Sequence, residues 1–86
     1  MNTVLTDVAN RIAKVHILQH NATFEIYPIS VENQAYYMVV THPSLTSSIE
    51  EAISTKNIHD DIAAEYVHCR VHGMAAKLIS KLFAIR

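Results

Sequence analysis

Apolar residues recur at helical spacing near the start of the chain. Between residues 3 and 20 they stand three or four positions apart, at Leu5, Val8, Ile12 and Val15. Polar residues fill the opposite side at 100° per residue, which is the pattern of an amphipathic helix. Asn21 is a suitable stop because Asn tolerates the left-handed backbone conformation. The pattern therefore predicts a first helix from Thr3 to about His20.

The next two segments are rich in β-branched and aromatic residues. Residues 23–31 and 35–42 share this composition and are separated by only three residues, so they predict a two-stranded antiparallel hairpin. Pro28 cannot donate a hydrogen bond to a strand ladder, so the first strand is expected at an edge or with a bulge. Both alternate sets of the second strand are apolar, which predicts that both of its faces need cover.

The rest of the chain is predicted to be helical. Two overlapping Ser-x-x-Glu patterns at residues 47–51 match the capping box that opens a helix, so a short second helix is expected from about Ile49 to Thr55. A third helix, capped by Asn57, continues to Phe83 or beyond. The predicted architecture is a single small α+β domain over residues 1–86, with the order α-β-β-α-α, a two-stranded antiparallel hairpin and a long C-terminal helix.

This third helix carries two apolar stripes, and a chain of 86 residues rarely buries both. A homo-oligomer, either a dimer or a tetramer, is therefore expected to cover one of them. The candidate oligomer interface consists of Tyr66, Cys69, Gly73, Ala76 and Phe83.

Charge is segregated along the same helix, with acidic residues first and basic residues last. An antiparallel pair of identical helices centred on Gly73 would place Glu65 opposite Lys81 and Asp60 opposite Arg86. Gly73 at the crossing would let the two backbones approach closely. This geometry is one expected form of the oligomer.

Composition narrows the function classes. Half of the residues are apolar, 17% are charged and the formal net charge is −1, so the chain is predicted to fold and to have no general attraction to nucleic acid or to membranes. A single Gly excludes the Gly-rich phosphate loops, and no nucleophile elbow is present. We therefore expect neither enzymatic activity nor a cofactor.

Cysteine and targeting patterns bear on the compartment. Cys69 is the only cysteine, so no disulfide can form within the chain. Its place in the middle of a helix, on an apolar stripe, predicts a buried and unreactive thiol. The sequence has no apparent signal peptide and no apolar run long enough for a membrane span, so a cytoplasmic protein is expected.

Histidine supplies the one candidate chemical site. The possible metal ligands are His16, His20, Glu65, His68 and His72. Imidazoles one helical turn apart can chelate zinc or another transition metal, and a Glu-x-x-His pattern occurs in carboxylate-bridged metal sites. The alternative is a polar stripe that faces solvent or another subunit.

The chain as a whole resembles the small antirepressors of phages and mobile elements. The resemblance rests on its short length, the amphipathic first helix, the hairpin from Phe24 to His42 and the long helix after Asn57. The resemblance implies a homo-oligomer that binds a DNA-binding repressor and prevents operator binding, without contacting DNA itself. A metal-binding protein that uses the His and Glu residues, or another phage-type inhibitor of a host protein, is the alternative.

Overall fold

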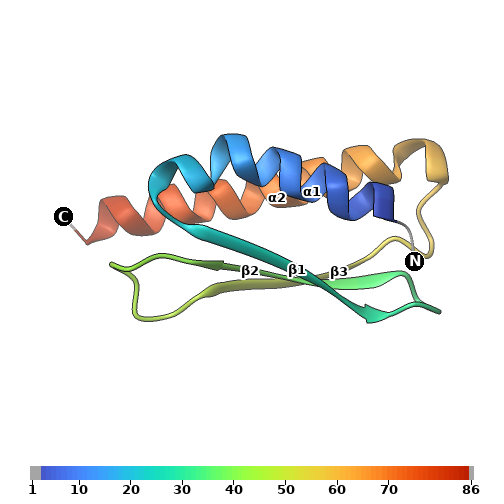
Figure 1. Ribbon diagram of the computed structural model, residues 1–86, viewed down its shortest axis with the longest axis horizontal. Helices are drawn as coiled ribbons and strands as arrows, with labels where there is room; N and C mark the ends of the chain where they lie inside the picture. Colours follow the sequence, from blue (N-terminus) through green and yellow to red (C-terminus); the bar gives the residue numbers. More distant parts are fainter. Residues whose placement is uncertain (1–2, 86) are drawn as a thin grey trace.

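The computed structural model describes residues 3–85, and it has two layers, with two helices on one face of a three-stranded sheet (Figure 1). The elements in chain order are α1 (Thr3–His16), the short 3₁₀ helix η1 (Leu18–His20), β1 (Thr23–Ser30), β2 (Ala35–Thr41), β3 (Ile49–Ser54) and α2 (Asp60–Ala84). The strands are antiparallel and lie in the order β1-β2-β3. The α+β class is confirmed, whereas the two-stranded sheet and the order α-β-β-α-α are wrong.

The buried side of the first helix is rotated from the predicted stripe but shares part of it: Leu5 is buried, and Val8 and Ile12 pack partly buried against the core. α1 ends at His16, η1 continues to His20, and Asn21 adopts the left-handed conformation at φ 63°, as its position predicted. Val15 is 54% exposed. The buried residues of α1 and the turn that follows are Leu5, Ala9, Ala13 and Ile17. Alanine at the centre of this side lets α1 pack close to α2.

The predicted hairpin is confirmed. β1 and β2 pair in register from Thr23–Thr41 to Pro28–Tyr36, and the register shifts between Pro28 and Ser30. Because β1 lies at an edge of the sheet and is irregular at this point, both expectations for a strand that contains Pro28 are met. Gln34, in the turn, has a positive φ of 47°.

The segment predicted as a short second helix is β3. Ile49 and Ile53 are four positions apart, a spacing that suits one face of a helix and also one face of a strand. In the structure both are buried, while Glu50 and Ala52 are exposed. Pairing with the apolar strand β2 outweighs the helix-capping pattern, because the second edge of β2 would otherwise have unpaired backbone groups. The Ser48 hydroxyl donates to the Glu50 carboxylate and caps no helix.

The long C-terminal helix is present, but its cap is not the predicted one. His59 is the N-cap residue, and its Nδ1 accepts a hydrogen bond from the backbone N–H of Asp61 at 3.4 Å. Asn57 therefore lies in the preceding turn. Asp60 and Asp61 occupy the first turn, where the helix dipole favours negative charge.

The hydrophobic core lies between the two layers. The inward side chains of β2, which are Tyr36, Met38 and Val40, are at most 2% exposed. They belong to one core cluster with the buried side of α2, which consists of Ala63, Val67, Val71, Met74, Ala75 and Leu78. Both helices thus cover the same face of the sheet, and no described element covers the other face (Figure 1).

Candidate interaction surfaces and histidine cluster

The uncovered outer face of the sheet is apolar and aromatic. Tyr27 of β1 and Tyr37 of β2 are register partners, and their rings stack with centres 6.3 Å apart. Val39 is half-buried on the same face, and Tyr27 is 42% exposed. Such a face fits contact with another protein, because Tyr is enriched in interfaces and contiguous exposed apolar surface marks interaction sites.

This outer face is also acidic. Glu25 and Glu50 are both register partners of Val39, one from each neighbouring strand. The Glu50 carboxylate accepts hydrogen bonds from the Tyr37 and Ser48 hydroxyls, which fix its position. No Lys or Arg occurs between Val15 and Thr55, so all the Lys and Arg of the chain lie outside the strand-forming part of the sequence. The outer sheet face therefore favours a basic partner surface.

A second open surface runs along α2, on the side away from the core. It follows the alternating spacing of four and three residues that is typical of helix–helix seams, and it comprises Ile62, Tyr66, Cys69, Gly73, Ala76, Ser80 and Phe83. Ile62 is 55% exposed and Phe83 is 63% exposed. Tyr66 is half-buried and accepts a hydrogen bond from Arg70 Nη1 at 2.7 Å. We call this set the α2 outer face; it contains all five predicted interface residues.

Cys69 and Gly73 at the middle of the α2 outer face are open to solvent. Cys69 is exposed, so the expectation of a buried thiol is wrong for the single chain. Cys69 lies on the apolar stripe of α2 opposite its buried side, so the core does not cover the thiol. A Cβ atom added at Gly73 would have no heavy atom within 4 Å, so this glycine is not required for packing inside the chain.

An ion-pair network joins α2 to the inner side of β3. Glu51 accepts hydrogen bonds from Arg70 Nε at 3.1 Å and from Lys77 Nζ at 2.9 Å. Burial by itself would raise the pKa of Glu51, but the bonds from Arg70 and Lys77 outweigh it and lower the pKa below 4.5. The hydrogen bond to Glu51 raises the pKa of Arg70, although desolvation acts in the opposite direction. The network is a structural connection between the two layers.

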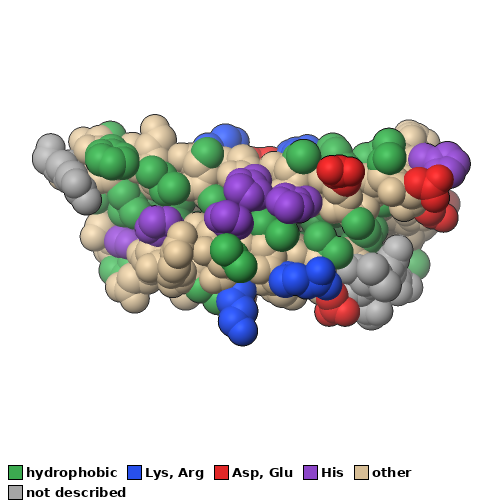
Figure 2. Space-filling view, turned by 90° about the horizontal axis from the view of Figure 1, so that it is seen from above, with side chains coloured by type: hydrophobic (Ala, Val, Ile, Leu, Met, Phe, Trp, Pro, Cys, Tyr) green, Lys and Arg blue, Asp and Glu red, His purple; other side chains and the backbone are tan. Residues whose placement is uncertain are grey.

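Three histidines from two helices meet on the helical layer, and Figure 2 shows His side chains gathered in the middle of that face. The ring centre of His16, at the end of α1, lies 4.1 Å from that of His72 in α2, and the planes are tilted by 48°. His68 stacks on His72 with 5.1 Å between ring centres. The structure therefore brings together three of the five predicted metal ligands.

The remaining predicted ligands are placed differently. The carbonyl oxygen of His20 lies 3.1 Å from Nε2 of His42, and Glu65 is exposed one turn before His68. In the side-chain orientations of the structure, the His, Cys, Asp and Glu residues within 3–85 form no group of three arranged to hold a metal ion. Desolvation and the neighbouring His16 and His68 lower the pKa of His72.

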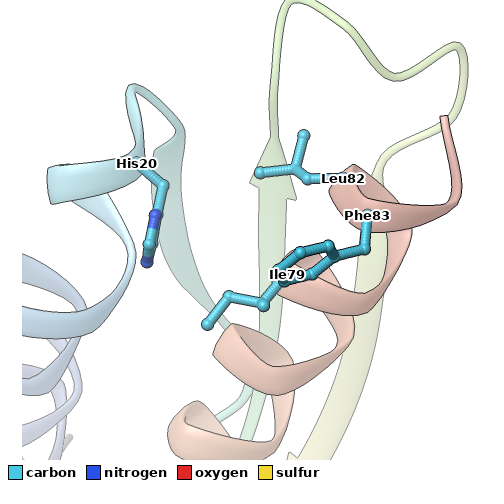
Figure 3. Close-up of a pocket in the computed structure, with 4 residues that line it drawn as sticks. All are labelled: His20, Ile79, Leu82 and Phe83. Carbon is cyan, nitrogen blue, oxygen red and sulfur yellow. The ribbon is translucent and has the colours of Figure 1, made fainter. Parts of the chain in front are cut away.

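A small apolar pocket lies between η1 and the end of α2. Its volume is about 180 Å³, and its lining residues are His20, Ile79, Leu82 and Phe83 (Figure 3). The imidazole of His20 faces the three apolar side chains from the other side of the pocket. The pocket is below the size of about 300–1,000 Å³ that is usual for small-molecule sites, and it suits one inserted apolar side chain.

In comparisons with known proteins, no family model, no curated protein and no solved structure matches the chain. Within the part of the chain that the structure describes, neither helix is both long and apolar enough to cross a membrane.

The sequence reasoning missed the outer sheet face as a site. It assigned Glu50 and Glu51 to a helix cap, although they lie on opposite faces of β3. The signal that could have identified the face is the run of 41 residues from Val15 to Thr55 without Lys or Arg, together with paired tyrosines on the hairpin.

Proposed function

We propose that this chain is a non-enzymatic, protein-binding regulator of the antirepressor type, which binds a DNA-binding repressor through its outer sheet face and prevents operator binding. It would act in the cytoplasm and would not bind DNA itself. The observation that carries this proposal is an open apolar sheet face whose charged side chains are the carboxylates of Glu25 and Glu50.

The chemistry of this face suits a repressor. Proteins that bind DNA present Lys and Arg to the phosphates, so their DNA-binding surface is basic. Carboxylates beside Tyr27 and Tyr37 offer such a surface both charge complementarity and aromatic anchors. The same negative charge repels DNA, which supports binding to the repressor alone.

The test uses a repressor that co-purifies with the chain from host cells, bound to its operator DNA. Adding the chain should release the DNA, while the chain alone should leave the DNA unshifted at physiological salt. Glu25→Lys should raise the concentration needed for half-release about tenfold, since it reverses a charge in the contact. Asp7→Lys reverses a charge on α1 that is also exposed, and it should leave release unchanged.

Two results would contradict the proposal. One is a specific shift of DNA by the pure chain. The other is an equal effect of Glu25→Lys and Asp7→Lys on operator release, which would remove the outer sheet face from the contact.

We further propose that copies of this chain associate through the α2 outer face, as a dimer or tetramer. Its support is the heptad-like spacing of exposed residues, with small side chains at its centre that allow two helices to approach closely. Glu65 and Lys81 lie about 160° apart around α2, on opposite flanks of this face. Arg86 lies outside the described residues. These charges therefore do not choose between parallel and antiparallel pairing.

Cys69 offers a direct test of the orientation. In a parallel pair the two copies of Cys69 meet, so the natural chain should form a disulfide-linked dimer under mild oxidation. In an antiparallel pair centred on Gly73 they lie roughly 12 Å apart along the axis, too far to bond. There, Ala76→Cys should instead cross-link to Cys69 of the other copy, and Cys69→Ser should abolish that link. A chain that sediments as a monomer at micromolar concentration would overturn the proposed self-association.

A further inference from the structure

We propose that His16, His68 and His72 form a binding site for one divalent transition-metal ion of the zinc class, which ties the end of α1 to the middle of α2. This inference is independent of the proposed repressor binding, because the cluster lies on the helical layer and not on the outer sheet face.

The spacing of the rings matches that of a chelate. Zinc binds imidazole nitrogen at about 2.0–2.1 Å, so the ion lies about 3.2 Å from each ring centre. A tetrahedral angle then puts two ring centres about 5 Å apart. The observed separations are 4.1 Å between His16 and His72 and 5.1 Å between His68 and His72. His16 and His68 therefore each lie beside the ring of His72, at separations close to the one that a shared ion requires.

Rotation of the side chains is the remaining step. The rings of His68 and His72 now stack with 16° between their planes, so their nitrogens do not converge on one point. His68 and His72 are exposed and His16 is only half-buried, so no packed core opposes turning of the rings about their side-chain bonds. Exposed side chains change rotamer within picoseconds to nanoseconds. Metal binding would convert the stack into a three-nitrogen set with an open fourth position for water.

The ligand type points to the class of ion. Three imidazoles and no carboxylate favour Zn²⁺, Ni²⁺ or Cu²⁺ over Mg²⁺ or Ca²⁺, which prefer oxygen. Two of the ligands are one turn apart in α2, and the third comes from α1. An ion held by all three would therefore connect two helices, whereas a chelate of His68 and His72 alone would connect nothing.

The experiment titrates the untagged full chain with ZnCl₂ and NiCl₂ by calorimetry, with MgCl₂ as the negative control, and follows thermal unfolding with and without chelator. We expect one ion per chain, and a rise in melting temperature of about 10 °C when free zinc exceeds its Kd a hundredfold. His16→Gln should weaken binding at least about tenfold and reduce the stabilisation at the same free zinc to about half or less, because it removes the ligand from α1. His72→Gln should abolish both.

The matched controls are His20→Gln and His59→Gln, which change histidines outside the cluster and should bind zinc as the natural chain does. Circular dichroism should show that every variant is folded. The proposal is wrong if zinc does not bind at 100 µM, or if His16→Gln binds it as tightly as the natural chain. One ion per two chains would also overturn it, since the ligands would then come from different copies.

Discussion

The two faces of β2 have similar side chains and opposite surroundings. Tyr36, Met38 and Val40 point to the helices and are at most 2% exposed, whereas Tyr37 and Val39 point to the uncovered face. The same strand thus contributes an aromatic ring and a valine to each side. Hydrophobic content alone does not separate the surface that stabilises the fold from the surface that remains for a partner; the placement of the two helices does.

α2 repeats this contrast on a single helix. Its inner side is closed by the core, while its outer face leaves Ile62 and Phe83 more than half exposed. The charges of β3 show the same difference. Glu51, on the inner side, is neutralised by Arg70 and Lys77. Its neighbour Glu50, on the outer side, has only hydroxyl groups among the partners described. The inner surfaces are covered or paired within the chain, whereas the outer surfaces leave apolar area and charge exposed to solvent.

The largest effect is expected from a matched pair of valines on β2. Val40→Ala should lower the free energy of unfolding by about 2–3 kcal/mol, because it removes two methyl groups from a fully buried position and leaves a cavity. Val39→Ala makes the same chemical change on the outer side, and should cost less than about 1 kcal/mol. Urea denaturation of both variants measures the difference. Equal losses would show that the outer face is covered in solution.

A second matched pair compares adjacent carboxylates. Glu51→Gln should destabilise the chain by about 1–2 kcal/mol, because Arg70 loses its charged partner at a partly buried site. Glu50→Gln, on the outer side of the same strand, should change stability by no more than about 0.5 kcal/mol. Thermal unfolding at pH 7 distinguishes them. A larger loss for Glu50→Gln would reverse the assignment of inner and outer sides of β3.

The element that sequence reasoning could not identify was β3, and the physical reason lies in its partners. Ile49 and Ile53 fit a helix or a strand equally well, and Glu51 is unexpected inside a layered fold until Arg70 and Lys77 are known to lie across from it. Those partners are 19 and 26 residues away in sequence. The local Ser-x-x-Glu pattern therefore favoured a helix, whereas pairing with residues distant in sequence made this segment a strand.

Elements with strong local signals were predicted well. Residues close in sequence determine four of these features: the hairpin, the irregularity at Pro28, the left-handed stop at Asn21 and the length of α2. For the histidines, the one-turn spacing of His68 and His72 was visible in the sequence, but the approach of His16 depends on how α1 lies along α2. Tertiary packing alone selects which of the predicted ligands meet.

Acid titration tests the ion pairs on the inner side of β3. The pKa of Glu51 is lower in the folded chain than its usual value of 4.5, so the unfolded chain binds the proton first as the pH falls. The stability that Glu51 contributes is therefore complete above pH 4.5 and is lost as the pH drops below it. Melting temperatures between pH 6 and pH 3 should fall less steeply for Glu51→Gln than for the natural chain.

The smallest effect is expected at Gly73, and it has the opposite sign. Gly73→Ala should raise the free energy of unfolding by about 0.5–1 kcal/mol, because glycine is a poor helix former, and the added methyl group meets nothing within the chain. Ala76→Gly, on the same outer face, should lower stability by a similar amount. Dilute samples isolate this effect from self-association. If Gly73→Ala also weakens the oligomer in sedimentation experiments, a second helix covers the α2 outer face and approaches at this residue. A gain in stability with unchanged association would place the contact elsewhere.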